Sequence, residues 1–358
     1  MDISSAPLTE GSLQENQDVP AFKDRSSLLI VFGAVQIILG ALCALFIPLM
    51  LLGIVMSHNE GAPSVPLSTH LMAVAVYFGL AVAFIWLGIG SIRAQRWAHA
   101  LTLITSWIGL ISGIFIVIIV TAILPVSFLA GIRAASSQNP QATGVSTGVM
   151  AAILTFMIVI FAVCLIGIPT AFVIFYSRRN VLETCRRRDP VERWTDRCPL
   201  PVLAACVLFI SGAVYSLFFG ITTPVFPFFG KYITGIPAGI VFIFFAALDF
   251  FLAWAVFRRR IFAWWLAVCV IGLRVISYAI TFEHRNILEA YSRLGWSSSY
   301  VQMLRQNPLV RSGVIQWWGL GFSLVFLGYL IYLKKYFKAA QPQATISADN
   351  SSVSLPAS

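Results

Sequence analysis

The chain has 358 residues, of which 59% are hydrophobic and only 11% are charged. A soluble globular domain has about 45–50% apolar and about 25% charged residues, so this composition excludes an ordinary water-soluble fold. The formal net charge of +10 does not indicate nucleic-acid binding, because the Lys and Arg residues lie in short clusters at the ends of apolar runs, as they do in membrane proteins.

The first 25 residues form a polar segment that is rich in acidic residues and contains Lys23 and Arg25. It has neither a basic start nor an apolar core, so we predict a disordered cytoplasmic tail and not a cleaved signal peptide. Residues 337–358 are polar as well and are predicted to form a second disordered cytoplasmic tail.

Eight apolar runs lie between these tails, and each is long enough to cross a hydrocarbon core of about 30 Å as a helix. They cover residues 27–56, 69–92, 97–129, 147–177, 201–223, 235–257, 261–282 and 313–333. The predicted fold class is therefore all-α, a polytopic transmembrane helical bundle of eight spans in contact with the lipid bilayer. The third and fourth runs are longer than a simple crossing, so we expect them to tilt, to kink near Pro125 and Pro169, or to project beyond the bilayer.

Lys and Arg residues are concentrated in one set of alternating loops, which includes both ends of the chain and the segment 178–200. The positive-inside rule places that set in the cytoplasm. We therefore predict a multi-pass protein of the plasma (inner) membrane with both termini cytoplasmic.

A weak internal repeat relates the two halves of the membrane region. Residues 35–46 match residues 207–218, and the pattern Arg93, Ala98 and Leu101 recurs as Arg258, Ala263 and Leu266. Because each half has an even number of spans, the repeats would be parallel, related by an axis along the membrane normal. The predicted organisation is a first four-helix half (26–177), a charged cytoplasmic linker (178–200) and a second four-helix half (201–336).

The linker contains seven arginines that are partly offset by four acidic residues. A solvated linker is the preferred interpretation, and a lipid-headgroup or partner site is the alternative. Cys185 and Cys198 are predicted to be reduced thiols in the cytoplasm. Two cysteines cannot complete a tetrahedral zinc site, so no metal is expected there.

Residues 193–204 (RWTDRCPLPVLA) resemble a stretch of uncharacterised multi-pass bacterial membrane proteins, and this resemblance implies a bacterial plasma membrane but no activity.

The distribution of acidic and histidine residues weighs against an enzyme. Asp249 is the only acidic residue within a predicted span, and the four histidines lie near span ends without ligand spacing. Membrane hydrolases and proton-coupled transporters usually need several buried carboxylates or histidines. We therefore expect no catalytic residues, no metal site and no cofactor.

One polar stripe stands out in the seventh span, where Arg274, Ser277, Tyr278 and Thr281 share a helix face. An arginine in the membrane costs about 2.5–3.5 kcal/mol on insertion scales, so it needs a partner. Asp249 in the preceding span is the candidate partner. Asp249 and Arg274 lie about 13 and 21 Å along their helices from the turn that connects them, so their depths differ by about two helical turns or less. The pair is either a lock between two helices or the charged lining of a cavity that binds a small polar solute.

Two further patterns predict packing. Gly109 and Gly113 have a spacing that permits close helix approach, within the chain or between protomers, and packing within the chain is the preferred interpretation. In the loop 283–312, the apolar residues Ile287, Leu288, Tyr291 and Leu294 form a stripe. We predict a short amphipathic helix there, as an interfacial anchor in preference to a lid.

The leading functional hypothesis is a non-enzymatic integral membrane protein of the small-solute transport or binding type. Its predicted substrate-binding residues are Asp249, Arg274, Ser277, Tyr278 and Thr281. The alternative is a structural or regulatory membrane protein that recruits partners through its charged cytoplasmic segments.

Overall fold

The computed structural model describes residues 24–59, 67–138, 147–285, 287–306, 310 and 313–338. Both predicted tails lie almost wholly outside these residues. Eight helices in the described ranges are long and apolar enough to cross a membrane, which confirms the predicted helical bundle of eight spans. They are α1 (Ser26–Asn59), α2 (Leu67–Ile92), α3 (Arg96–Gln138), α4 (Thr147–Ala162) continued by η1 (Val163–Gly167) and α5 (Ile168–Tyr176), α7 (Leu200–Thr222), α8 (Ile236–Phe257), α9 (Ile261–His284) and α13 (Val314–Tyr332).

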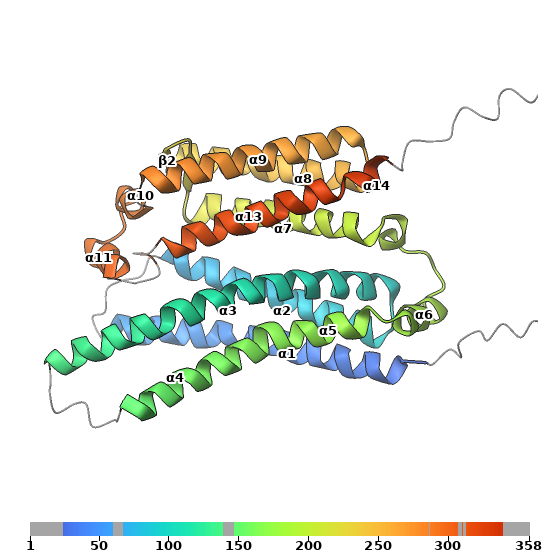
Figure 1. Cartoon of the computed structure of the whole chain (residues 1–358), viewed down its shortest axis with the longest axis horizontal. Helices are drawn as coiled ribbons and strands as arrows, with labels where there is room; N and C mark the ends of the chain where they lie inside the picture. Colours follow the sequence, from blue (N-terminus) through green and yellow to red (C-terminus); the bar gives the residue numbers. More distant parts are fainter. Residues whose placement is uncertain are drawn as a thin grey trace, which may run out of the picture.

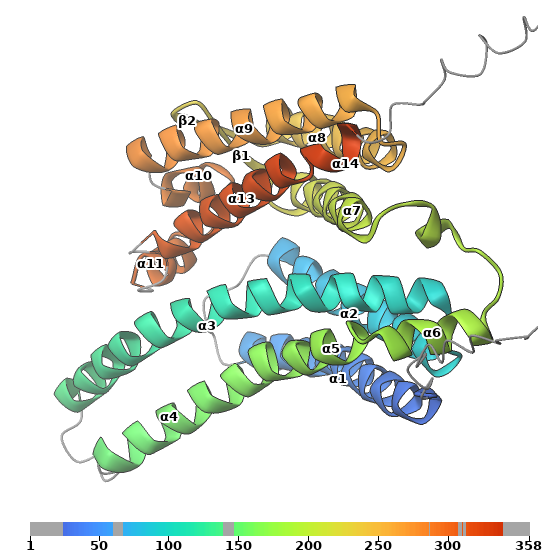
Figure 2. The same cartoon turned by 45° about the vertical axis from the view of Figure 1, so that its right-hand side comes forward.

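The helices form two groups that lie side by side, with α1 to α5 in one and α7, α8, α9 and α13 in the other (Figures 1 and 2). One end of the bundle, called the basic end here because its short helices are rich in Lys and Arg, carries α6 (Arg179–Arg188), η2 (Trp194–Arg197) and α14 (Lys334–Lys338). The opposite end, called the hairpin end, carries the two strands β1 (Val225–Phe228) and β2 (Lys231–Thr234) and the helices α10 (Ile287–Arg293) and α11 (Ser298–Gln306). Large apolar side chains such as Leu52, Phe156 and Ile240 are more than half exposed, as expected for surfaces in contact with lipid.

The first two helices of each half pack closely through glycines. An ideal Cβ atom at Gly33 on α1 would lie 2.8 Å from the Gly88 carbonyl oxygen on α2, and the reverse distance is 2.7 Å. In the second half, a Cβ atom at Gly239 on α8 would lie 3.3 Å from the Gly220 carbonyl oxygen on α7. Small residues at such crossings let helix backbones approach each other.

The turns after α2 and α8 have the same backbone geometry. Ala94 and Arg259 hold left-handed conformations with φ angles of 52° and 53°. The Ala94 N–H donates to Ser91 O and the Gln95 N–H to Gly90 O, while the Arg259 N–H donates to Val256 O and the Arg260 N–H to Ala255 O. These turns directly follow Arg93 and Arg258, which are matched in the sequence repeat, so the two turns share local geometry as well as sequence.

A second structural match joins the third and last helices of each half. His99 Nε2 on α3 donates to the carbonyl oxygen of Tyr176 on α5 at 2.9 Å. Trp264 Nε1 on α9, at the corresponding position of the repeat, donates to the carbonyl oxygen of Leu330 on α13 at 2.6 Å. Each half thus uses one ring N–H near the basic end to fix its last span.

The fourth span contains a π-helical turn, η1, before Pro169. Pro169 has no N–H, so it cannot donate to the carbonyl group of Leu165, four residues earlier. That carbonyl oxygen faces α3 so closely that a Cβ atom at Gly113 would overlap it, whereas a Cβ atom at Gly109 would lie 3.7 Å from Pro169. The prediction that the Gly109 and Gly113 spacing serves packing within the chain is confirmed. The other proline, Pro125, lies inside the continuous helix α3.

A two-stranded antiparallel sheet between α7 and α8 was not predicted. Its strands pair Val225 with Thr234 and Phe228 with Lys231. The turn residues Phe229 and Gly230 have φ angles of 38° and 84°, and positive φ at both central positions defines a type I′ hairpin. The chain is therefore not entirely α-helical, and this hairpin caps the second half at the hairpin end (Figure 1).

Candidate functional site

Asp249 on α8 and Arg274 on α9 form an ion pair inside the second half. Both terminal nitrogens of Arg274, Nη1 and Nη2, donate to the Oδ2 oxygen of Asp249 at 3.0 Å. Asp249 is only 1% exposed. The guanidinium carbon of Arg274 lies 4.3 Å from the centre of the Phe245 ring, within the range of a cation–π interaction. The structure therefore brings the two charged residues of the predicted pair into direct contact.

The second oxygen of this carboxylate, Oδ1 of Asp249, is buried and has no hydrogen-bond partner within the described part of the chain. An arginine can bind both oxygens of a carboxylate at once, so the observed geometry leaves one acceptor unused. Gly212 on α7 lies on another side of the carboxylate, where an ideal Cβ atom would be 3.6 Å from Oδ2. The spans α7, α8 and α9 thus surround the Asp249 carboxylate, and one of its two oxygens lacks a hydrogen bond within the described residues.

Ser277 and Thr281 lie about one and two helical turns after Arg274 on α9, and their hydroxyl groups hold the hairpin. The Ser277 hydroxyl accepts from the Phe229 N–H and donates to the Pro227 carbonyl oxygen, both at 3.0 Å. The Thr281 hydroxyl accepts from the Gly230 N–H at 3.0 Å and donates to Ser277 O at 2.7 Å. Ser277 and Thr281 of the predicted polar stripe therefore contact backbone atoms of the hairpin.

Tyr278, one helical turn after Arg274 on α9, contacts the hairpin through its aromatic ring. Its ring packs against Phe226 of β1, with ring centres 6.3 Å apart, and against Phe282, at 5.8 Å. Phe226 also stacks on Phe245, the residue that contacts Arg274. A continuous aromatic contact thus links the hairpin to the charged pair.

The linker between the halves is folded and docked at the basic end. The side chains of Val181 and Cys185 on α6 pack into a core cluster with Leu29 of α1 and Phe175 of α5. Burial raises the pKa of the Cys185 thiol to about 12, so it is neutral near pH 7. Cys198 is buried in the separate core cluster of the second half. Within the described ranges no group of three His, Cys, Asp or Glu side chains could hold a metal ion.

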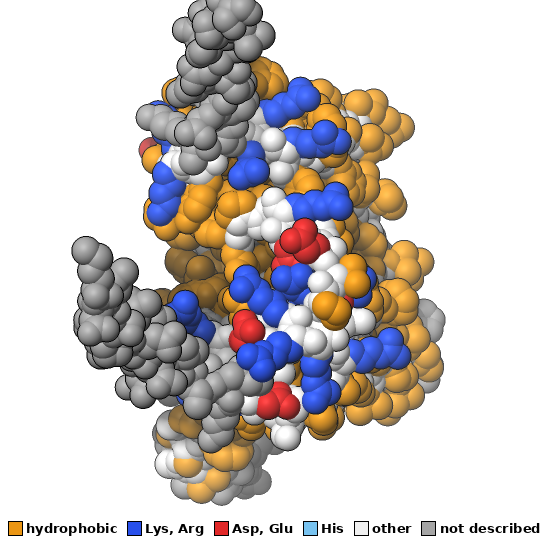
Figure 3. All heavy atoms as spheres, turned by 90° about the vertical axis from the view of Figure 1, so that its right-hand side faces the viewer, with side chains coloured by type: hydrophobic (Ala, Val, Ile, Leu, Met, Phe, Trp, Pro, Cys, Tyr) orange, Lys and Arg blue, Asp and Glu red, His pale blue; other side chains and the backbone are white. Residues whose placement is uncertain are grey.

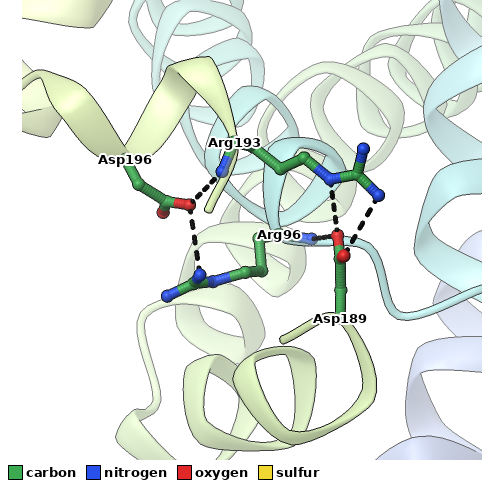
Figure 4. Close-up of polar contacts among 4 residues, drawn as sticks. All are labelled: Arg96, Asp189, Arg193 and Asp196. Atoms are coloured by element: carbon green, nitrogen blue, oxygen red, sulfur yellow. Dashed lines mark hydrogen bonds and ion pairs between the residues drawn. The ribbon is translucent and has the colours of Figure 1, made fainter. Parts of the chain in front are cut away.

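One ion pair and one backbone hydrogen bond fasten the linker to Arg96 at the start of α3, and a second ion pair lies within the linker (Figure 4). Asp189 accepts two hydrogen bonds from the guanidinium group of Arg193, both at 3.1 Å, and one from the Arg96 N–H at 3.3 Å. Asp196 accepts from the Arg193 N–H at 3.0 Å and lies 3.5 Å from Nη1 of Arg96. A solvated linker was the preferred interpretation of this sequence, but these contacts make the segment part of the packed structure.

Acid should weaken the docking of the linker. The pKa of Asp189 lies below its usual value, mainly because the Arg193 side chain binds the carboxylate and to a smaller extent because the Arg96 N–H does. A carboxylate with a lowered folded-state pKa stabilises the fold above about pH 4 and loses that contribution as pH falls through the folded-state value. We expect Asp189→Asn to lose about 1–2 kcal/mol at pH 7, a modest figure because Arg193 is 38% exposed and solvent screens the pair. Unfolding midpoints in detergent from pH 7 to pH 3 should fall less in Asp189→Asn than in the wild type.

Glu183→Gln is the matched control for Asp189→Asn, because Glu183 also pairs with an arginine four residues away, Arg187, but both side chains are largely exposed. Its cost should stay below about 0.5 kcal/mol. Equal losses for the two variants would show that the Asp189 contacts do not stabilise the linker.

Described residues away from the ion pair line an apolar groove and a polar pocket. An apolar groove of about 370 Å³ lies between the halves and is lined by α3, α7 and α13, with Trp107, Leu208 and Phe322 among its residues. A polar pocket of about 140 Å³ lies at the hairpin end between β2 and α10. Asp249 and Arg274 line neither of them.

Comparisons of the chain with protein-family models, with curated proteins and with solved structures found no match. The eight apolar helices define the class, a multi-pass integral membrane protein in contact with the lipid bilayer. A more specific function has to be inferred from the site itself.

Proposed function

We propose that this protein binds a small polar solute at the Asp249–Arg274 pair and moves it across a bacterial plasma membrane, with the basic end in the cytoplasm. The orientation is supported by the exposed Lys and Arg side chains that cover the basic end (Figure 3). The bacterial membrane is supported only by the resemblance of residues 193–204.

The observation that carries the proposal is the unpartnered Oδ1 oxygen of Asp249. A lock between two helices would be strongest with both carboxylate oxygens satisfied, since a buried acceptor without a partner costs about 1–3 kcal/mol. An N–H or O–H group of a solute would satisfy this oxygen. Because Arg274 already balances the charge of Asp249, the pair favours a neutral or zwitterionic solute that carries such a donor.

Access to the pair requires movement, because Asp249 is 1% exposed. Ser277 and Thr281 fix the hairpin at one end of α9, and the Tyr278 ring packs against Phe226 of the hairpin. In this proposal the hairpin and Tyr278 cover the site, and the Ser277 and Thr281 hydroxyls hold that cover in place. Rocking of the two repeats against each other is the motion that transporters with internal repeats use.

Binding should appear as a solute-dependent rise in the unfolding temperature of the purified protein in detergent. We expect at least one member of a panel of amino acids, polyols and amides to stabilise the wild type. Asp249→Asn should abolish the shift, since it alters the oxygen that would accept the solute. Thr155→Ala on α4, where the hydroxyl donates to the Ala151 carbonyl oxygen of its own helix and lies far along the chain from the pair, is the control that should retain it.

An absence of any shift across the panel, or a shift that Asp249→Asn leaves unchanged, would refute the proposal. The alternative function, recruitment of partners at the basic end, is favoured by the exposed arginines Arg178, Arg186 and Arg197. It is weakened by the internal ion pairs that Arg96 and Arg193 form.

A further inference from the structure

The polar pocket at the hairpin end combines several cationic side chains with a buried hydroxyl group. It has a volume of about 140 Å³ and lies between β2, the residue after α9, and α10. Its lining residues are Lys231, Tyr232, Arg285, Glu289, Ala290 and Arg293. Figure 1 shows α10 below the hairpin at this end of α9.

The charges around this pocket are unbalanced. Three cations, Lys231, Arg285 and Arg293, surround it with one carboxylate, that of Glu289. None of the three cations takes part in an ion pair among the described residues. Like charges held around one hollow repel each other, and an anion in the hollow would remove that repulsion.

Arg285 is positioned to bind an anion with its free end. Its Nε atom lies 3.4 Å from the Gly230 carbonyl oxygen in the hairpin turn, and the Gly230 N–H is itself held by Thr281. No hydrogen bond of the two terminal nitrogens of Arg285 is found within the described ranges. A guanidinium group fixed through Nε presents a planar pair of donors that suits phosphate and carboxylate.

Tyr232 supplies a donor that lacks an acceptor. Its hydroxyl oxygen is buried and has no hydrogen-bond partner in the described part of the chain. Burial raises the pKa of this phenol to about 12, helped by Tyr291 and Glu289, so it remains a neutral donor near pH 7. An oxygen atom of a bound anion would satisfy it.

We infer that this pocket binds a small oxyanion, a phosphate or carboxylate group, through Lys231, Arg285, Arg293 and the Tyr232 hydroxyl. The volume is well below the about 300–1,000 Å³ of pockets for drug-sized ligands, so the bound group has few atoms. The site is separate from the Asp249–Arg274 pair and does not depend on the function proposed for that pair. On the proposed topology it faces the outer surface, where the oxyanion is either a free solute or the headgroup of an anionic lipid.

Inorganic phosphate is the first probe. At matched ionic strength, phosphate should raise the unfolding temperature of the detergent-solubilised full chain more than chloride does. Arg293→Gln and Tyr232→Phe should weaken phosphate binding, the first by about tenfold for the loss of one charge-assisted hydrogen bond. Glu289→Gln should instead strengthen binding, because it removes the only negative charge in the lining.

Arg305→Gln is the matched control for Arg293→Gln. Arg305 lies on α11 at the same end of the bundle, is exposed and does not line the pocket, so the same change of charge should leave phosphate binding unchanged. Arg285→Gln is less suitable as the main variant, because it would also release the hairpin contact. Asp249→Asn should retain the phosphate effect, which separates this test from that of the solute site.

The second probe is a nanodisc that contains phosphatidylglycerol, compared with one that contains only phosphatidylcholine. A phosphate effect lost in Arg293→Gln supports a free oxyanion as the ligand. Stabilisation by phosphatidylglycerol alone, also lost in Arg293→Gln, supports the same pocket with a lipid headgroup as its ligand. Absence of both effects, or effects of equal size in Arg293→Gln and Arg305→Gln, would overturn the inference.

Discussion

Replacing Gly113 with Ala is expected to destabilise the first half by about 1–3 kcal/mol, the usual cost of overpacking. A Cβ atom at this position would overlap the Leu165 carbonyl oxygen of η1. The obstacle is a backbone atom next to Pro169, so no side chain can rotate away to relieve the overlap. The free energy of unfolding, or the unfolding temperature in a fixed detergent, measures the loss.

Gly109→Ala is the internal control, because it adds the same methyl group one turn away on the same helix. Its Cβ atom would lie 3.7 Å from Pro169, an ordinary van der Waals distance. The variant should be neutral or gain up to about 1 kcal/mol, since alanine favours helix more than glycine does. If the two alanine variants had the same stability, the close approach of α3 to the π-helical turn would be wrong.

The eight spans could be predicted from sequence because each apolar run exceeds the length that a crossing requires. The helix ends were less predictable. The third run was expected to end at residue 129, but α3 continues to Gln138, since apolarity marks the membrane and not the end of the helix. The π-helical turn could not be predicted either, because Pro169 signals a disturbed helix without specifying its geometry.

The hairpin had no readable signal in the sequence. Its turn uses Phe229 and Gly230, whereas Asn-Gly and Asp-Gly are the usual signs of a type I′ turn. Its anchors are backbone atoms bonded to Ser277 and Thr281, about 50 residues further along the chain. A polar residue on an apolar helix face indicates that a partner exists, but it does not identify that partner.

The candidate site was therefore predictable in part. The contact between Asp249 and Arg274 followed from their depth and from the cost of an unpaired arginine in the membrane. The substrate-binding role of these residues remains a proposal. The folded state of the linker was missed because its arginines read as a solvated charge cluster, whereas the apolar face formed by Val181 and Cys185 docks α6.

The ion pair itself is expected to give the largest energetic coupling in the molecule. Asp249→Ala would leave Arg274 without a partner inside the membrane, and Arg274→Ala would leave a buried carboxylate. Deleting one partner of a buried pair costs about 3–5 kcal/mol, because the remaining charge is left uncompensated. The double variant leaves no such charge, so it should recover part of each loss.

Stability in detergent should be measured for the wild type, both single variants and the double variant. The Arg274 contact with Phe245 is lost in every variant that lacks the arginine, so it cancels in the cycle. We expect an interaction free energy between the two substitutions of at least about 0.5 kcal/mol. A larger value is expected if water is excluded from the pair, as the 1% exposure of Asp249 indicates. A parallel cycle between Asp249→Ala and Thr281→Ala, which loosens the hairpin without touching the pair, should be additive. Additive losses for Asp249 and Arg274 would mean that the two charges do not depend on each other, and Arg274 would then have to be stabilised by water that reaches the site.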